Sequence, residues 1–271
     1  MEHVIWISGM PRSGTTWLSQ IFASSPDVRL KFCPLFSYEF KNALTDRSTA
    51  EEWRELFAAV YTKKSEYLDQ HYLRRDGLVP EFKDKNQFPS HLVIKSTRFH
   101  HLTEKILTLN PDLRFIHIVR DPRASIYSWI SNPYEFPSDA DVSVEWKTGR
   151  CRKQGVGEFW GFEDWYDTTK QALEMQIKFK ERFVVVKYEE LKSSPLKTIE
   201  QLFSFSGLEV TEQTRDFIRL SQSRTAHNSN KRSVYKDPQK VESWRSALDR
   251  NIANTIAAQV KNSELSQFLD G

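Results

Sequence analysis

The feature that most constrains this chain is the stretch VIWISGMPRSGTTWL, which covers residues 4–18. It begins with a short apolar run that is typical of a buried strand. The run enters a loop bracketed by Gly9 and Gly14, and apolar residues then recur at helical spacing over residues 17–22. A strand, a tight loop and a helix N-terminus in this order favour anion binding, because backbone N–H groups converge there and the helix dipole attracts negative charge.

The spacing of this loop matches that of a phosphate-binding P-loop, with one change. Gly9 and Gly14 stand five positions apart, but Thr15 and Thr16 follow where the P-loop pattern has a lysine and then Ser or Thr. The lysine that would contact the β- and γ-phosphates is therefore absent, and a cation occurs earlier, at Arg12. We expect such a loop to hold an anionic group without magnesium, which indicates a phosphate donor other than ATP.

The octapeptide PRSGTTWL, residues 11–18, resembles the loop that binds the 5′-phosphosulfate in sulfotransferases, which use 3′-phosphoadenosine 5′-phosphosulfate (PAPS). The resemblance implies that six consecutive residues bind this donor: Arg12, Ser13, Gly14, Thr15, Thr16 and Trp17. On these residues alone, a glycine turn without function remains the alternative. The rest of the chain decides between the two interpretations.

Four further near-continuous apolar runs predict buried strands over residues 28–32, 91–95, 113–120 and 183–187. Helical patterns lie between them, and the one over residues 53–61 has apolar residues at every third or fourth position. Such an alternation predicts an α/β fold, a P-loop-NTPase-like parallel sheet with helices on both faces. No repeat or linker divides the chain, so we expect a single sulfotransferase domain over residues 1–271.

Other segments have a helical pattern, and between two of them lies a loop rich in Pro, Ser and Asp. The predicted helices cover residues 34–41, 99–109, 122–130, 159–179, 195–206, 211–222 and 241–260. The polar, aperiodic stretch 76–90 is predicted to be a surface loop.

Polar residues just past the strands matter most, because parallel sheets bind ligands at the carboxyl ends of their strands. Arg120 ends one strand, and Ser128 lies two turns into the next helix, so that both could hold one phosphate. The pair resembles the 3′-phosphate motif of sulfotransferases, and the string VRDPRA over residues 119–124 resembles the carbohydrate branch of that family. An ion-paired arginine and a surface serine form the alternative.

Two later segments also resemble the sulfotransferase pattern. Tyr188 opens the string YEELKSSP, and the resemblance implies that it brackets the adenine together with Trp17. A basic loop near residue 230 resembles the C-terminal phosphate clamp, which implies donor binding by Lys231, Arg232 and Ser233. Two core aromatics and a solvated basic loop are the alternatives.

Sulfuryl transfer to a hydroxyl needs positive charge around the sulfonate and an acceptor for the hydroxyl proton. Arg12 and Lys95 are our candidates for the positive charge. The base is less clear, because Thr97 stands where cytosolic sulfotransferases have a histidine, and Cys33 stands where carbohydrate sulfotransferases often have a glutamate.

Two nearby residues are candidates for the missing base. His100 lies one helical turn beyond Thr97, and Glu39 lies one turn into the helix predicted after Pro34. We select His100 and keep Glu39 as its alternative.

The segment between Pro133 and Tyr166 is rich in aromatic residues interspersed with cations and acids. Flat aromatic faces beside polar groups suit a sugar ring better than a purely apolar ligand. The aromatics are Tyr134, Phe136, Trp146, Phe159, Trp160, Phe162, Trp165 and Tyr166. We therefore expect this segment to cover the acceptor site, with anchoring of the long helix in the core as the alternative.

Charge and cysteine content exclude several other classes of protein. The formal net charge of +3 suits an anionic small molecule and is too weak to indicate nucleic-acid binding. Only two cysteines occur, so no disulfide framework or cysteine-based metal site is expected. No apolar run approaches the roughly 20 residues that span a bilayer, and the first strand leaves no room for a signal peptide. We expect a cytoplasmic protein. The sequence does not decide whether an anchor precedes Met1, or which oligomeric state the protein has.

The sequence thus predicts an enzyme that transfers the sulfuryl group of PAPS to a small-molecule or glycan hydroxyl, with release of adenosine 3′,5′-bisphosphate (PAP) and without a metal. A P-loop kinase is one alternative, but it would require a lysine at position 15, where Thr15 stands, and an acidic magnesium ligand. Asp121 is the only candidate ligand, and its position suits a helix cap. A catalytically inactive nucleotide-binding module is the other alternative, and the missing base motif is its best support.

Overall fold

The computed structural model describes residues 3–223, 228–236 and 242–270. Its centre is a sheet of five strands: β1 (His3–Ser8), β2 (Val28–Phe32), β3 (His91–Ser96), β4 (Arg114–Val119) and β5 (Phe183–Lys187). The strand order is β2-β3-β1-β4-β5, and every neighbouring pair is parallel. This confirms the predicted α/β fold, and all five strands end at the same edge of the sheet.

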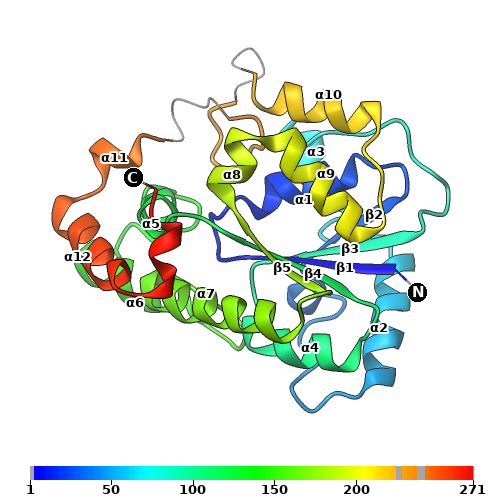
Figure 1. The fold of residues 1–271 in the computed structure, drawn as a ribbon, viewed down its shortest axis with the longest axis horizontal. Coiled ribbons are helices and arrows are strands. Elements are labelled where there is room, and N and C mark those ends of the chain that lie inside the picture. Colours follow the sequence, from blue (N-terminus) through cyan, green and yellow to red (C-terminus); the bar gives the residue numbers. More distant parts are fainter. Residues whose placement is uncertain (1–2, 224–227, 237–241, 271) are drawn as a thin grey trace.

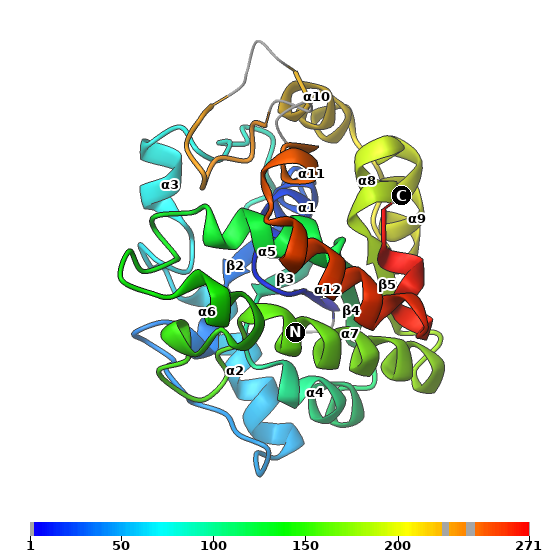
Figure 2. The ribbon, with the colours of Figure 1, turned by 90° about the vertical axis from the view of Figure 1, so that its left-hand side faces the viewer.

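Helices cover both faces of the sheet (Figure 1). The helices above it in this view are α1 (Thr15–Ala23), α8 (Tyr188–Ser193), α9 (Pro195–Ser206) and α10 (Glu212–Ser221). Those below it are α2 (Ala50–Thr62), α4 (Thr103–Leu109) and α7 (Gly161–Lys178). Four more lie on the side where the strands end and face the viewer in Figure 2: α5 (Pro122–Ile130), α6 (Val142–Thr148), α11 (Trp244–Ala247) and α12 (Arg250–Lys261).

The chain also contains several shorter elements. They are α3 (His71–Arg75) and the 3₁₀ helices η1 (Pro34–Phe36), η2 (His100–Leu102), η3 (Arg150–Arg152) and η6 (Glu264–Phe268). The predicted loop over residues 76–90 contains no helix or strand and leads into β3.

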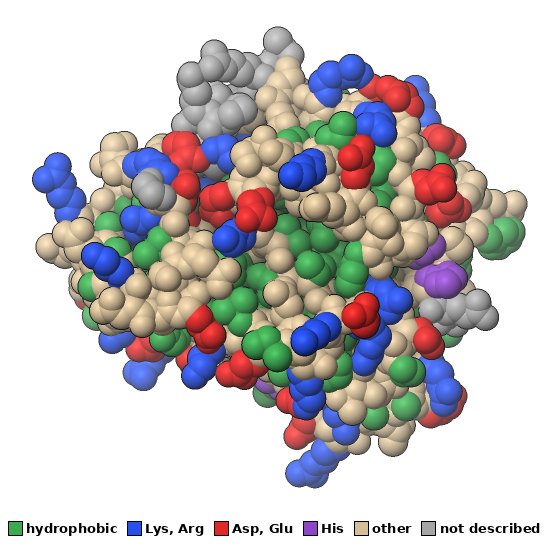
Figure 3. Space-filling view, in the orientation of Figure 1, with side chains coloured by type: hydrophobic (Ala, Val, Ile, Leu, Met, Phe, Trp, Pro, Cys, Tyr) green, Lys and Arg blue, Asp and Glu red, His purple; other side chains and the backbone are tan. Residues whose placement is uncertain are grey.

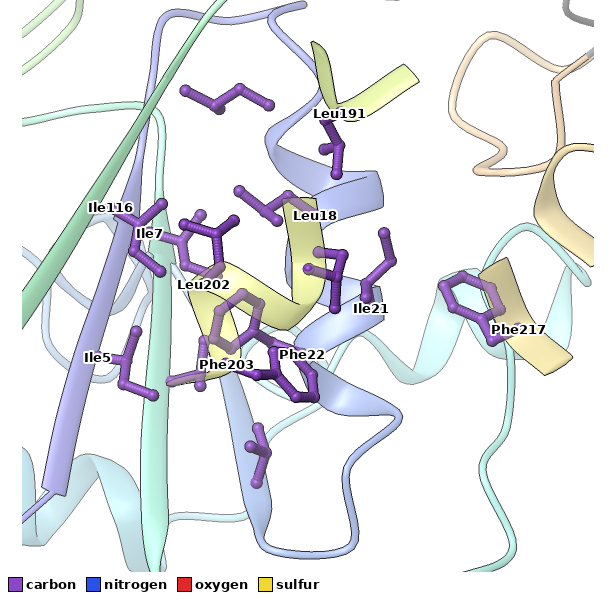
Figure 4. Packing of buried hydrophobic residues seen from close by; sticks show 14 of the residues in the cluster. Ile5, Ile7, Leu18, Ile21, Phe22, Ile116, Leu191, Leu202, Phe203 and Phe217 are labelled. Carbon is purple, nitrogen blue, oxygen red and sulfur yellow. The ribbon is translucent and has the colours of Figure 1, made fainter. Parts of the chain in front are cut away.

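The central strand β1 contributes to two separate cores, because successive side chains of a strand point to opposite faces. Ile5 and Ile7 pack with Leu18 and Phe22 of α1 in the core above the sheet, which Figure 4 shows from close by. Trp6 points the other way, into a second core between the sheet and helices α2, α4 and α7. Burying one such side chain stabilises the fold by about 1.5–3 kcal/mol, so the two cores fix β1 and the loop that follows it.

Two predicted helices differ from the observed structure near the sheet edge. The helix expected over residues 34–41 is only the single 3₁₀ turn η1, because the hydroxyl of Ser37 accepts a hydrogen bond from the Phe40 N–H and so competes with a continuing helix. The helix expected over residues 99–109 begins one residue later, because Phe99 has a left-handed backbone with φ of 60°, and its first turn is the 3₁₀ helix η2, which leads into α4.

Two further differences concern capping residues. Helix α6 occurs inside the loop expected after residue 130, where the Asp141 side chain accepts the Ser143 N–H. The helix expected over residues 241–260 is broken into α11 and α12, because Asp249 caps a new N-terminus. Residue 241 itself lies outside the described residues.

Candidate functional site

A pocket with a volume of about 550 Å³ lies where the strands end. It brings together segments that are far apart in the sequence: the loop after β1, the end of β3, helix α5, the start of α8 and the chain near residue 230. Most of the predicted site residues line it: Arg12, Gly14, Thr15, Thr16, Trp17, Lys95, Arg120, Ser128, Tyr188, Lys231, Arg232 and Ser233. Ser13 and His100 are not among the described residues on its wall.

The loop after β1 has the shape of an anion cradle. Gly14 has φ of 90°, and a Cβ at this position would lie 2.5 Å from Cδ2 of Tyr188, so only glycine fits. Helix α1 begins at Thr15, and the first N–H groups of a helix have no partner within that helix. The Ser13 hydroxyl is buried and has no hydrogen-bond partner among the described residues. Unused donors at a helix N-terminus are what a phosphate or phosphosulfate requires.

Arg12 connects this loop to three other parts of the pocket. Its Nε donates to Oγ of Ser128 at 3.1 Å, and its Nη2 donates to the carbonyl oxygen of Lys231 at 3.0 Å. Its Nη1 lies 3.5 Å from Oε1 of Glu135. Burial and the nearby Arg120 lower the pKa of Arg12, whereas Glu135 raises it. The guanidinium is thus held at the junction of the segments that form the pocket.

Arg120 and two aromatic rings form the adjoining wall. The Arg120 Nη1 donates to the Arg12 carbonyl oxygen at 3.2 Å, and its guanidinium carbon lies 4.7 Å from the centre of the Tyr188 ring. The rings of Trp17 and Tyr188 meet edge to face at 6.3 Å, and Trp17 Nε1 donates to Ser221 Oγ at 2.9 Å. The structure therefore brings together the residues predicted for the 3′-phosphate and for the adenine.

Lys95 lies at the carboxyl end of β3 and is almost completely buried. Its Nζ lies 4.5 Å from the centre of the Phe32 ring. The pKa of Lys95 is lowered to about 8, mainly by burial and also by the nearby Arg12 and Arg98, whereas Cys33 and Glu135 act to raise it. An anion bound beside Lys95 would favour its charged form.

Neither predicted base reaches the pocket. His100 is buried, and its Nδ1 lies 3.2 Å from Oγ of Ser8, with its ring edge-on to His117 and Phe159. Burial and the neighbouring His117 hold the pKa of His100 well below its usual value. Glu39 is also not among the described residues on the pocket wall. The left-handed turn at Phe99 carries the chain away from the strand end, which is why adjacency in sequence did not place His100 in the pocket.

Lys231, Arg232 and Ser233 of the predicted clamp all line the pocket, and Arg232 also stacks on an aromatic ring. Arg232 stacks on the Tyr134 ring, with 4.7 Å between the guanidinium carbon and the ring centre. Lys231 Nζ lies 3.5 Å from Oγ of Ser131. Val234 N–H donates to the Leu78 carbonyl oxygen at 2.9 Å and so ties this segment to the body of the protein.

Asp121, the only candidate for a magnesium ligand in a kinase, is used by the fold. Its carboxylate accepts the Arg123 N–H at 2.8 Å, pairs with the Arg123 guanidinium at 2.6 Å and accepts the Asp270 N–H at 2.8 Å. Asp121 is therefore the cap of α5, as its sequence position indicated. Among the described residues, no group of three His, Cys, Asp or Glu side chains could hold a metal ion.

The predicted acceptor segment is divided between core and pocket. Most of its aromatics are buried together beneath α5 and α12: Phe136, Trp146, Trp160, Phe162 and Trp165. Only Tyr134 and Trp160 line the pocket. For the other aromatics the alternative was correct, because they anchor α6 and α7 in the core.

The positive charge of the pocket extends beyond the residues that the sequence indicated. Nine cations line it among the described residues: Arg12, Lys95, Arg98, Arg120, Arg152, Lys192, Lys231, Arg232 and Lys236. On the face shown in Figure 3, by contrast, basic and acidic side chains are interspersed. Sequence reasoning missed Arg98, Lys192 and Lys236, because only the folded chain brings them to the pocket. Arg98 lies just past the end of β3, beyond Thr97, which is the one signal that could have identified it.

Comparisons with known proteins agree with this geometry. The family model described as the sulfotransferase domain matches residues 2–268. Carbohydrate sulfotransferase 3 of Tetronarce californica is 28% identical over 149 residues, 54% of this chain and 33% of that protein. Carbohydrate sulfotransferase 5 of Mus musculus is 30% identical over 137 residues, 48% of this chain and 34% of that protein. The chain thus matches about a third of the length of these relatives.

Solved structures share the fold at low sequence identity. Mouse sulfotransferase SULT7A1, solved in complex with PAP, has a TM-score of 0.55 and 16% identity, with 98% of this chain and 88% of that chain covered. The sulfotransferase domain from the curacin biosynthetic pathway has a TM-score of 0.53 and 16% identity, with 97% and 99% covered.

Proposed function

Because this chain belongs to the sulfotransferase domain family, we propose that it transfers the sulfuryl group of PAPS to a hydroxyl of a carbohydrate or a similarly hydroxylated acceptor. One observation carries the proposal: Arg12 of the cradle lies 3.1 Å from Ser128 and contacts Arg120 through its backbone. The cradle, which suits the 5′-phosphosulfate, thus adjoins the Arg120–Ser128 pair, which suits the 3′-phosphate. A donor that carries both groups requires this arrangement.

The donor side of the pocket fits PAPS group by group. The N–H groups over residues 14–16 suit the 5′-phosphosulfate, since the Ser13 N–H already donates to the Met10 carbonyl oxygen. Arg120 suits the 3′-phosphate, and Ser128 can add to it, because its oxygen accepts from Arg12 and leaves the hydroxyl proton free to donate. The edge-to-face pair of Trp17 and Tyr188 suits the adenine ring.

PAPS supplies an activated sulfuryl group when it is bound. Arg12 and Lys95 would stabilise the negative charge that develops during transfer, since both are cations held in a pocket with little solvent. Lys231, Arg232 and Ser233 would close the donor side from the opposite wall. No residue in this scheme requires a metal.

The acceptor side combines flat rings with charged hydrogen-bond donors. Two arginine–aromatic stacks line it: Arg98 on Phe36 at 3.7 Å and Arg152 on Trp160 at 5.6 Å. The Nε of Arg152 is buried and has no hydrogen-bond partner among the described residues. A sugar presents apolar ring faces and many hydroxyls, and it would use both kinds of group. The names of the curated relatives, carbohydrate sulfotransferases 3 and 5, support the same class of acceptor.

A kinase is less well supported, because the loop lacks the P-loop lysine and Asp121 is occupied by Arg123. None of the helices among the described residues is long and apolar enough to cross a membrane. The cytoplasmic location expected from the sequence stays a prediction.

The proposal is tested by incubating the protein with radiolabelled PAPS and three sets of acceptors: a pool of oligosaccharides, simple phenols and a sterol. We expect label to enter the oligosaccharides. Transfer to the phenols or the sterol alone would contradict the carbohydrate acceptor and leave the donor intact. No transfer to any set, together with no PAP binding, would contradict the sulfotransferase activity itself.

A further inference from the structure

The pocket contains a proton acceptor that neither motif spacing nor the predicted bases indicated. Among the described residues that line it, Glu135 is the sole carboxylate, and none is a histidine. Nine cations share the wall with this one acid. A sulfotransferase pocket still has to take up the proton of the acceptor hydroxyl, so the position of Glu135 is of special interest.

Glu135 lies beside both cations that would handle the sulfonate. Its Oε1 lies 3.5 Å from Nη1 of Arg12, which is a long contact for an ion pair, and its charge acts on the nearby Lys95. About a quarter of its side chain is exposed, on the pocket side. Its second oxygen, Oε2, is buried and has no hydrogen-bond partner among the described residues.

An unsatisfied carboxylate oxygen is costly to bury, so Glu135 has an unused capacity to accept a hydrogen bond. The terminal torsion of a glutamate side chain is broad, and rotation about it exchanges the two oxygens. A carboxylate has about four lone-pair positions, so the pocket-lining Glu135 can accept a ligand hydroxyl while one oxygen stays near Arg12. A substrate hydroxyl is a donor of the kind that this carboxylate lacks.

The backbone of Glu135 is fixed, although it lies in a loop. Its N–H donates to the Asn132 carbonyl oxygen at 3.0 Å, and its own carbonyl oxygen accepts the Trp129 Nε1–H at 3.4 Å. The next residue, Phe136, is buried against Trp129. The carboxylate is thus held by the core on one side and faces the pocket on the other.

We propose that Glu135 is the general base of the transfer, an inference that rests on the proposed sulfotransferase function. The acceptor O–H bond breaks, and its proton passes to the Glu135 carboxylate. The acceptor oxygen forms a bond to sulfur, while the bond from sulfur to the bridging phosphate oxygen breaks. PAP leaves with that bond's electron pair, and Arg12 balances the charge of Glu135 before the proton arrives.

The test compares Glu135→Gln with the wild-type protein in two measurements: PAP affinity by calorimetry, and turnover of radiolabelled PAPS with the oligosaccharide pool. Glutamine keeps the size of the side chain and cannot take the proton. We expect turnover to fall by roughly 10²- to 10⁴-fold, the range for loss of a general base. PAP affinity should stay within about threefold.

Two variants serve as controls. Glu66→Gln removes the same charge from an exposed ion pair with Arg75 and should leave both measurements unchanged. Glu39→Gln tests the alternative carboxylate, and a large loss of turnover there, with Glu135→Gln active, would overturn the proposal.

Other outcomes are equally decisive. Turnover of Glu135→Gln within about tenfold of wild type would overturn the proposal and move the proton to another group, with Lys95 as the first to test. Loss of turnover together with an equal loss of PAP affinity would mean that Glu135 only holds Arg12 in place. A wild-type protein that neither binds PAP nor transfers label would instead contradict the proposed function on which the inference rests.

Discussion

The two sides of the pocket are built in different ways. On the donor side, the cradle consists of consecutive residues, 12–17, whose backbone shape requires Gly14. On the acceptor side, Arg98 after β3 stacks on Phe36 of η1, and the Arg152–Trp160 stack comes from a third part of the chain. In the proposed function, the cradle for the 5′-phosphosulfate is therefore encoded locally, whereas recognition of the acceptor depends on tertiary packing. Substitutions on the two sides should consequently affect different ligands.

The largest effect is expected from Gly14→Ala, which acts on the donor side. The new Cβ would lie 2.5 Å from the Tyr188 ring, and alanine is strained at φ of 90°, by about 1–3 kcal/mol before the clash is counted. Both effects deform the cradle and displace the adenine wall. We expect PAP affinity, measured by calorimetry, to fall by at least about 100-fold.

Gly77→Ala is the matched control for this substitution. Gly77 also has positive φ, 66°, but a Cβ there meets no atom within 4 Å. It should lower the melting temperature slightly through backbone strain and leave PAP affinity unchanged. Equal losses of PAP affinity in both variants would refute a locally encoded cradle.

Arg120→Ala should have the next largest effect. It separates binding of the 3′-phosphate from binding of the rest of the donor. Loss of a hydrogen bond to a charged phosphate costs about 1.5–3 kcal/mol, or roughly 10- to 150-fold in PAP affinity. Affinity for adenosine 5′-phosphosulfate, which lacks the 3′-phosphate, should hardly change. If both ligands weaken equally, Arg120 acts through the Arg12 backbone and the Tyr188 ring that it contacts.

Arg152→Ala should have the smallest effect and should act on the acceptor side alone. Arg152 lines the pocket with an unsatisfied Nε beside Trp160, so the variant removes about 1 kcal/mol of hydrogen bonding to the acceptor. The acceptor KM should rise roughly fivefold in a steady-state assay, with unchanged PAP affinity. A change in PAP affinity instead would assign Arg152 to the donor side and break the division between the two sides.

The same contrast explains what the sequence could and could not predict about the site. Arg120 and Tyr188 follow strands directly, and Arg12 lies in the loop after β1. Strand ends of a parallel sheet converge, so their meeting in one pocket was foreseeable. His100 lies as far past the end of β3 as Arg12 lies past the end of β1, yet the chain after Phe99 buries it elsewhere. Proximity to a strand end alone therefore did not decide which side chains reach the pocket.

The fold was predictable for a similar reason. The apolar runs that form strands are local signals, and all five strands occur where they were expected. The errors occurred where a side chain competes with the backbone for hydrogen bonds, as Ser37 and Asp249 do. Glu135 has no sequence signature, because its role depends on where the core places it.

The central claim is that the pocket accepts a 3′-phosphorylated adenine nucleotide rather than a triphosphate with magnesium. It is tested most directly by isothermal titration calorimetry of the wild-type protein with PAP, without added metal, and with ATP plus magnesium in a parallel titration. We expect PAP to bind at least about tenfold more tightly than ATP, a difference of about 1.4 kcal/mol or more. Equal affinities, or tighter binding of ATP with magnesium, would contradict it.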